Sequence, residues 1–216
     1  MRIGFDAKRA FNNYSGLGNY SRFVISNICK FYPENEYFLY TPNAPDENIF
    51  PVPDNARVVK PYHITGKLYR SYWRTFRINH WLSLDGIKIY HGLSNEIPSG
   101  IHRNGIRSLI TIHDLIFLKL PNLYKRFDRY TYKRKVLYGV TAADKIIAVS
   151  RQTKEDIMKL LDVHEEKIDV IYQGCHHKYY EKVDGNVLHF IKTKYTLPDE
   201  YLLYVGTIEE RKNLLK

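Results

Sequence analysis

The sequence has few cysteines. Among its 216 residues there are 2, Cys29 and Cys175, which lie far apart in the chain. Two separated thiols do not form a disulfide framework, and they fit a reducing compartment. No Cys/His group has metal-ligand spacing, because the adjacent His176 and His177 point in different directions. We therefore expect no structural disulfide, no metal and no cofactor.

Long apolar runs are missing as well. No stretch approaches the roughly 20 apolar residues that are needed to cross a bilayer. The first residues, MRIGFDAKRAF, have a strand pattern followed by charge, which is unlike a signal peptide. We therefore expect a cytoplasmic protein.

Acidic residues are too few to balance the basic ones. The formal net charge is +10, from 33 Lys and Arg against 23 Asp and Glu. Such a charge favours an anionic partner: nucleic acid, a membrane surface or a phosphorylated substrate. No nucleic-acid-binding signature accompanies it, so nucleic acid is the least favoured of the three. Apolar residues make up 44% of the chain, which is enough for a folded core.

Strand and helix patterns alternate along the chain. Short apolar runs predict strands at residues 2–7, 36–41, 57–61, 88–92, 107–114, 145–150 and 167–174. Helical spacing predicts helices at 18–32, 64–84, 123–143 and 151–161, the last with Ser150 as its N-cap. This alternation predicts an α/β fold with a doubly wound, mainly parallel, Rossmann-like sheet.

The C-terminal part has weaker periodicity. Residues 175–198 read as a linker with one short helix, and a new strand is predicted to begin at Tyr201. We expect one domain over residues 1–195 and the first strand and helix start of another over 196–216. So short a piece cannot bury a core, so we expect the chain to be a fragment.

The strand at 107–114 stands out because it stops at a titratable pair, His113 and Asp114. Ligands of open α/β sheets bind at the carboxyl ends of the strands, which makes the pair a candidate site. The alternative is that Asp114 caps a turn and His113 is a core histidine. The pair alone does not decide between them.

Six motifs in order resemble the retaining glycosyltransferases of family 4, which have the GT-B fold: GLGNYSRFV, HGLSNEIP, TIHDLIFLKLP, IIAVSRQTKEDI, VIYQG and YVGTIEERKNL. The first five resemble the N-terminal domain, and the last resembles the start of the nucleotide-binding domain. The resemblance implies transfer of a sugar, with retained configuration, from a nucleotide-sugar to a glycan or lipid-linked acceptor. Close relatives include mannosyltransferases of bacterial polysaccharide synthesis. The fragment alone is expected to be inactive.

The resemblance also implies roles for particular residues. His113 would lie beside the donor sugar, and Arg211 and Lys212 would contact the donor diphosphate. The departing phosphate would act as the base, so no protein nucleophile is expected. Asp114 would orient His113 or cap a turn.

Gly16, Leu17 and Gly18 precede a predicted helix, where glycines let backbone amides approach an anion. In the family this loop closes over the donor phosphates. An ordinary loop and helix start is the alternative. Ser21 stands where the dinucleotide-binding fingerprint has its third glycine, which disfavours a nicotinamide oxidoreductase.

Four polar residues at other strand ends are candidates for contacts with the acceptor: Asp6, His91, Asn95 and Glu96. A turn closed by Pro98 explains the last three equally well.

The predicted helix at 64–84 is basic and aromatic. It carries Lys67, Arg70, Arg74 and Arg77 without an acidic residue among them. Three interpretations remain open: a half-buried helix with a solvated basic face, a helix on an anionic membrane surface, or a nucleic-acid-binding helix. The second leads to the alternative function, a non-catalytic membrane-surface or anion-binding module on a Rossmann-like scaffold. It would place the protein at the inner face of the membrane.

Overall fold

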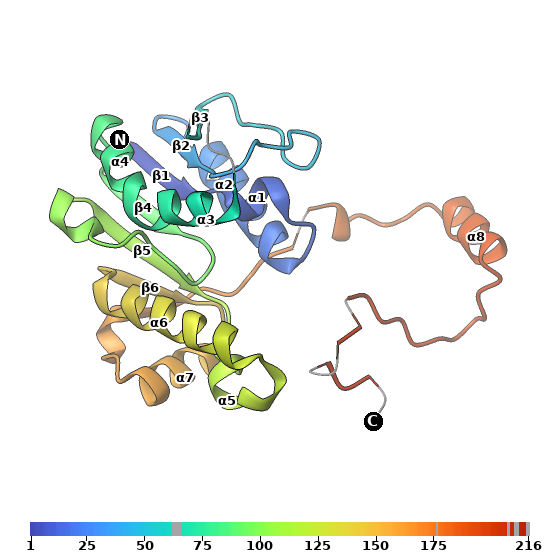
Figure 1. Cartoon of the computed structure of the whole chain (residues 1–216). Helices are drawn as coiled ribbons and strands as arrows, with labels where there is room; N and C mark the ends of the chain where they lie inside the picture. Colours follow the sequence, from blue (N-terminus) through green and yellow to red (C-terminus); the bar gives the residue numbers. More distant parts are fainter. Residues whose placement is uncertain (62–65, 176, 207, 210–211, 215–216) are drawn as a thin grey trace. The chain divides into compact units, whose positions relative to one another are not determined.

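The computed structural model describes residues 1–61, 66–175, 177–206, 208–209 and 212–214. It divides into two units, Met1–Gln173 and Gly174–Lys216 (Figure 1). The first unit contains a 7-stranded sheet in the order β3-β2-β1-β4-β5-β6-β7. The strands are β1 (Arg2–Asp6), β2 (Glu36–Tyr40), β3 (Ala56–Val59), β4 (Ile89–Gly92), β5 (Arg107–Ile112), β6 (Lys145–Ala148) and β7 (Ile168–Val170). All neighbours pair in parallel, which confirms the predicted Rossmann-like α/β fold.

Helical segments connect these strands. They are α1 (Lys8–Asn12), α2 (Gly16–Phe31), α3 (Lys67–Tyr72), η1 (Trp73–Arg77), α4 (Ile78–Leu84), η2 (Ile101–Asn104), α5 (Ile116–Lys119), η3 (Pro121–Leu123), α6 (Arg126–Ala142), α7 (Arg151–Leu161) and η4 (Glu165–Lys167). The predicted N-cap of α7 is confirmed, because Ser150 Oγ accepts a hydrogen bond from the amide of Thr153 at 3.0 Å. The short helix α1 lies where the sequence predicted only a loop.

The core has two layers, one on each face of the sheet. Alternate side chains of β2 separate into them, as the pleat of a strand requires. Tyr37 and Leu39 pack in the layer that α1 and α2 cover. Phe38 and Tyr40 pack in the opposite layer, which α4, α6 and α7 cover (Figure 1). A sheet buried on both faces explains why its strands read as continuous apolar runs.

The strand order reverses direction between β1 and β4. From β1 the chain runs outward to β2 and β3, then returns to β4 and continues through β7 on the other side. In doubly wound sheets the crevice at this reversal, outside the carboxyl ends of the strands, is where ligands bind. In this chain it lies beyond Asp6 and Gly92.

The second unit contains η5 (His177–Tyr179) and α8 (Gly185–Lys194), in agreement with one short helix in the predicted linker. The division of the chain falls at Gln173 and Gly174, before the boundary predicted after residue 195. The strand predicted at Tyr201 is not formed: residues 201–206 have no strand, and Leu202 and Leu203 are exposed. A strand needs a neighbour to satisfy its backbone groups, and the described part of this unit has none.

Among the described residues, no helix combines the length and the apolar character that spanning a bilayer requires.

Candidate functional site

His113 directly follows β5, and its ring is held by neighbours on both sides. Its backbone amide donates to Asn95 Oδ1 at 2.9 Å. Its ring Nε2 lies 2.9 Å from the carbonyl oxygen of Leu93. A carbonyl only accepts hydrogen bonds, so Nε2 carries the proton and Nδ1 is the acceptor. The side-chain amide of Gln173 lies 3.2 Å from Nδ1 and donates to it.

Burial lowers the pKa of His113, although the hydrogen bond to Leu93 and the charge of Asp114 act in the opposite direction. The ring is therefore neutral near pH 7, with one nitrogen fixed and the other directed at an exposed, displaceable amide. Asp114 has the role of a turn cap, because its Oδ1 accepts from the amide of Ile116 at 3.2 Å. The half-buried His113 is thus neither a sealed core histidine nor a free surface one.

The start of α2 contacts His113 through Tyr20. The two rings meet edge to face with centroids 4.7 Å apart. Tyr20 Oη lies 3.0 Å from Thr111 Oγ1, which is also 2.8 Å from Nε2 of His91. His91 is buried, and burial together with the charge of His113 lowers its pKa to about 4. His91 is therefore too buried to make the predicted direct contact with an acceptor. It instead holds Thr111, which in turn contacts Tyr20.

The three residues Gly16, Leu17 and Gly18 form the first turn of α2 instead of preceding it as the sequence predicted. A Cβ on Gly18 would stand 1.8 Å from the carbonyl oxygen of Asn13, so only glycine fits here. The amides of Gly18 and Asn19 both donate to the carbonyl of Ser15, at 2.9 Å and 3.0 Å. Gly16 and Leu17 begin the helix that carries Tyr20. This turn thus lies on the element that contacts His113, while its role at donor phosphates remains a prediction.

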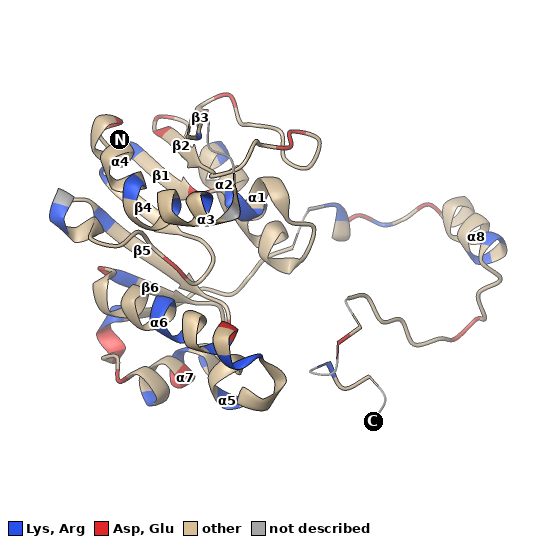
Figure 2. Ribbon diagram, viewed as in Figure 1, with Lys and Arg blue, Asp and Glu red and all other residues tan. Residues whose placement is uncertain are grey.

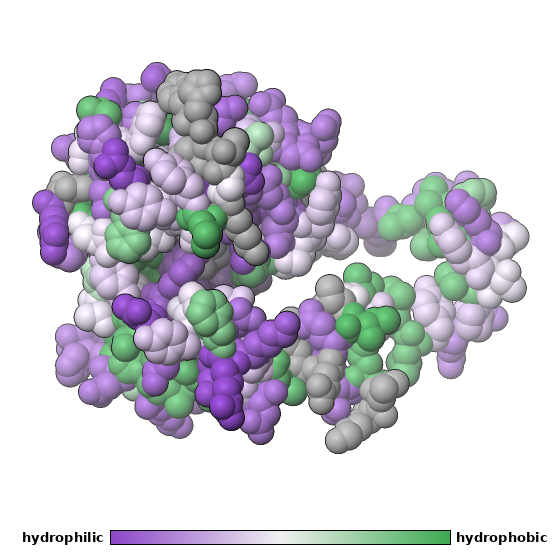
Figure 3. Space-filling model, in the orientation of Figure 1, coloured by the Kyte–Doolittle hydropathy of each residue, from purple (hydrophilic) through white to green (hydrophobic). Residues whose placement is uncertain are grey.

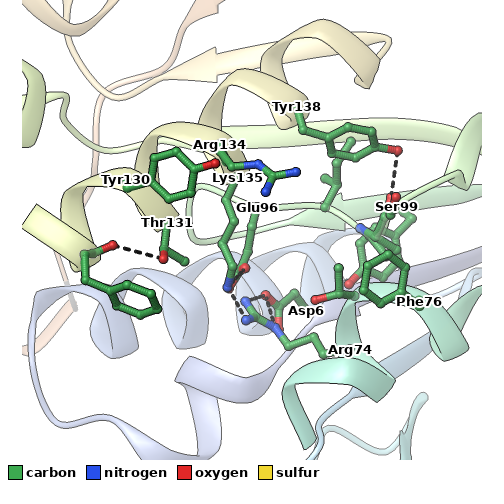
Figure 4. Close-up of a pocket in the computed structure, with 15 residues that line it drawn as sticks. Asp6, Arg74, Phe76, Glu96, Ser99, Tyr130, Thr131, Arg134, Lys135 and Tyr138 are labelled. Carbon is green, nitrogen blue, oxygen red and sulfur yellow. Dashed lines mark hydrogen bonds and ion pairs between the residues drawn. The ribbon is translucent and has the colours of Figure 1, made fainter. Parts of the chain in front are cut away.

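Asp6, Arg74, Glu96 and Lys135 form a buried ion cluster, called here the Arg74 cluster (Figure 4). Arg74 Nη2 lies 2.6 Å from Asp6 Oδ2, and Arg74 Nη1 pairs with Glu96. Lys135 Nζ completes the chain at 2.7 Å from Glu96 Oε2. The side chains of Asp6 and Arg74 are only 2% and 11% exposed. The prediction of Arg74 as a surface residue is therefore wrong, because Asp6 at the end of β1 and Glu96 in the loop after β4 pair with it below the surface.

The cluster keeps its carboxylates ionised. Burial alone would raise the pKa of Glu96, but Arg74 and Lys135 outweigh it and lower this pKa to about 2. Burial would likewise lower the pKa of Arg74, but Asp6 and Glu96 raise it. The cluster thus pairs two acidic with two basic side chains, whose formal charges balance.

Local backbone features position this cluster. Arg74 lies in η1, a π-helical turn, and its neighbour Trp73 is also buried. A π-turn is wider than an α-turn and is frequent at functional sites. On the other side, a Cβ on Gly92 would stand 2.2 Å from the carbonyl oxygen of Glu96, so glycine lets the loop after β4 fold back. Asn95, at φ 61°, fixes this loop to β5 through its amide, 3.0 Å from the carbonyl of Thr111.

A pocket of about 540 Å³ lies above the Arg74 cluster, between η1, α6 and the loop after β4 (Figure 4). The surface is hollowed here in the space-filling view (Figure 3). Beside the cluster it is lined by Thr75, Phe76, Tyr90, Ile97, Pro98, Ser99, Phe127, Tyr130, Thr131, Arg134 and Tyr138. It sits at the crevice where the strand order reverses, and two of the four predicted acceptor residues, Asp6 and Glu96, line it.

Other basic and aromatic side chains of this helical segment lie on the surface. Arg70 and Arg77 are exposed, and so are Tyr69, Tyr72 and Phe76. These aromatic rings form a row with centroid distances of 6.1 Å and 5.4 Å. Figure 2 shows the basic residues along this segment and along α6.

The described side chains of the first unit do not include three predicted site residues, Arg211, Lys212 and Lys67. Arg211 and the side chain of Lys67 lie outside the described residues. Lys212 is exposed and belongs to the second unit. Among the described residues, no group of three or more His, Cys, Asp or Glu side chains is placed to hold a metal ion.

Sequence reasoning missed Tyr20, Gln173 and Lys135. Tyr20 follows the glycine loop, and Lys135 lies in a basic helix, so both were near recognised signals. Gln173 lies in the motif VIYQG, but nothing in that motif pointed to a contact with His113.

These features define a Rossmann-like unit with a pocket at the reversal of its strand order. The profile of Glycosyltransferase Family 4 matches residues 24–179. The chain belongs to this family.

Curated relatives are mannosyltransferases. The O-antigen chain mannosyltransferase B of Escherichia coli is 29% identical over 128 residues, which cover 58% of this chain and 32% of that protein. The serotype-specific mannosyltransferase WbdA of Escherichia coli is 25% identical over 134 residues, which cover 59% of this chain and 16% of that protein. The chain thus matches a third or less of the length of these relatives.

Solved structures share the fold. A glycosyltransferase from Rickettsia africae superposes with a TM-score of 0.57 at 13% identity, over 92% of this chain and 50% of that one. HepE from Anabaena, in complex with UDP, also gives a TM-score of 0.57 at 13% identity, over 91% of this chain and 50% of that one.

Proposed function

We propose that the whole protein is a retaining glycosyltransferase that transfers mannose from a nucleotide-sugar donor to a glycan or lipid-linked acceptor in polysaccharide synthesis. Membership of family 4 supports the reaction class. The names of the two relatives support mannose and a polysaccharide product. Because the relatives are longer than the matched region, the activity is proposed for the whole protein rather than for residues 1–216.

The observation that carries the proposal is the state of His113. It stands at the carboxyl end of β5, its Nε2 proton fixed by Leu93 and its Nδ1 covered only by Gln173. When the Gln173 amide moves away, Nδ1 can accept a hydrogen bond from a hydroxyl of the donor sugar. A neutral ring in this position adds no positive charge next to the oxocarbenium-like centre that forms when the sugar–phosphate bond breaks.

The departing phosphate acts as the base in this proposal. The start of α2 faces the donor phosphates through the amides of Gly16 and Leu17, and Arg211 and Lys212 add positive charge. No protein nucleophile and no metal ion are required. The acceptor lies in the pocket above the Arg74 cluster, on the other side of the Leu93–Ile97 loop.

The test is a panel of nucleotide-sugars offered to the full-length protein with a mixture of glycan and lipid-linked acceptors. The proposal predicts acceptor-dependent release of nucleotide, greatest with a mannose donor. Absence of transfer with every donor would refute the enzymatic function. Transfer of a sugar other than mannose would refute only the choice of donor.

The exposed aromatic row at Tyr69, Tyr72 and Phe76, flanked by Arg70 and Arg77, supports a second function, contact with an anionic membrane. Charge reversal at Arg70 and Arg77 should weaken binding to vesicles that contain an anionic phospholipid. The control reverses Lys30 and Lys88, exposed residues outside this segment, for the same change of net charge. Equal loss in both variants would show that only the net charge matters.

A further inference from the structure

The floor of the pocket above the Arg74 cluster consists of paired charges. Asp6 and Glu96 are each paired with Arg74, and Lys135 takes the remaining oxygen of Glu96. These ion pairs offer hydrogen-bond donors and acceptors, and the charge of Lys8 also acts on Asp6, Arg74 and Glu96. Such a floor suits the hydroxyl groups of a sugar.

The wall of the pocket is different, because it contains a cation without an acidic partner. Arg134 lines the pocket, and within the described part of the chain no carboxylate lies in ion-pair distance of it. Its guanidinium lies 5.8 Å from the ring centroid of Tyr130, which holds it against the wall. Figure 4 shows it directed into the pocket, between Tyr130 and Tyr138.

The surroundings of Arg134 leave its positive charge unopposed within the described part of the chain. Asp128 is the single acid of α6, and it does not line the pocket. The acids that do line the pocket, Asp6 and Glu96, are already neutralised. An anionic group that enters at Arg134 therefore meets no competing carboxylate.

Aromatic side chains complete the wall. Phe76 and Tyr130 line the pocket and are 54% and 60% exposed, so their ring faces are available to a ligand. Aromatic faces pack against the apolar face of a sugar ring. The volume of about 540 Å³ falls in the range of pockets that bind small ligands.

We propose that this pocket binds an acidic acceptor: a sugar ring above the Arg74 cluster, with an attached phosphate or carboxylate group held by Arg134. The inference rests on the proposed function, since it names the acceptor class for the same site. Arg134 is the specificity-determining residue, because it distinguishes an acidic sugar from a neutral one. Guanidinium groups form two parallel hydrogen bonds with either anion.

The experiment measures binding to the full-length protein of four probes: mannose, mannose 6-phosphate, glucuronic acid and inorganic phosphate. Protein NMR or calorimetry at low salt gives the affinities. At least one acidic sugar should bind about tenfold more tightly than mannose, and more tightly than inorganic phosphate. The phosphate and carboxylate probes distinguish the two sources of charge.

Variants assign the effect to one side chain. Arg134→Gln should reduce the preference for the acidic sugar to less than twofold, and Arg134→Lys should keep part of it. Lys133→Gln is the matched control, an exposed neighbour that does not line the pocket. His113→Ala should leave this binding unchanged, so failure of the transfer reaction and failure of this inference can be told apart.

Three results would overturn the inference. If mannose bound as tightly as the acidic sugars, the charge of the ligand would not contribute to its recognition. Equal effects of Arg134→Gln and Lys133→Gln would remove the role of Arg134. Inorganic phosphate binding as tightly as mannose 6-phosphate would leave an anion site without a sugar site.

Discussion

Glu96 should make the folding free energy of the first unit depend on pH in the acidic range. Its pKa is lowered from 4.5 to about 2, because the charges of Arg74 and Lys135 outweigh the effect of burial. At roughly 1.4 kcal/mol per pKa unit, this difference corresponds to about 3 kcal/mol of folding free energy. Its side chain is only 22% exposed, so solvent screens the ion pairs weakly.

The sign follows from the direction of the pKa change. A lowered pKa in the folded state stabilises the fold above the unfolded value, near pH 4.5, and this stabilisation is lost as the pH falls toward 2. About 1 kcal/mol should already be lost between pH 7 and pH 3.5. The variant Glu96→Gln cannot ionise, so it should lack this part of the acid dependence.

The assay is urea denaturation of residues 1–216 at pH 7 and at pH 3.5, with unfolding monitored by tryptophan fluorescence. Both tryptophans, Trp73 and Trp81, lie in the helical segment that carries Arg74, so the signal reports on this region. The free energy of unfolding of wild type should exceed that of Glu96→Gln by a margin that is clearly smaller at pH 3.5 than at pH 7. An equal margin at both pH values would refute the ion-pair reasoning.

Three further predictions concern the same region. Arg74→Leu leaves two buried carboxylates with too few cations and should cost about 3–5 kcal/mol of unfolding free energy, whereas Arg77→Leu, at an exposed site, should cost little. Gly92→Ala should cost at least about 1 kcal/mol, because its Cβ would collide with the Glu96 carbonyl at 2.2 Å; unchanged urea midpoints would contradict this. In ¹⁵N NMR titrations His113 should be neutral at pH 7 with its proton on Nε2, and it should take up a second proton at a lower pH than an ordinary histidine, since burial lowers its pKa. A second proton taken up as readily as by an ordinary histidine, or a proton on Nδ1 of the neutral ring, would be inconsistent with this burial and with the Leu93 and Gln173 contacts.

The sheet could be predicted from the sequence because each buried strand is a short apolar run between polar turns. The position of His113 followed from the same pattern, since a site residue in such a fold comes where a buried strand ends. Both predictions depend on local sequence and on one general rule of α/β folds.

The Arg74 cluster could not be predicted, because its ion pairs join residues far apart in sequence. Around Arg74 the local sequence is basic and aromatic, which is also what a surface helix looks like. Its acidic partners come from the ends of β1 and β4, and a π-turn directs the side chain toward them. The strand predicted at Tyr201 is not formed for a related reason. A strand depends on a neighbouring strand, and the local sequence pattern does not reveal whether one is present.

The most direct test of the central claim is the turnover number of the full-length enzyme after substitution of His113. With the donor that the panel identifies, His113→Ala should lower kcat by about 100-fold or more, while vesicle binding and the urea midpoint remain close to those of wild type. His80→Ala, at an exposed histidine of α4, is the matched control and should retain wild-type activity. Equal activity of the His113→Ala and His80→Ala variants would contradict a transfer site at the end of β5.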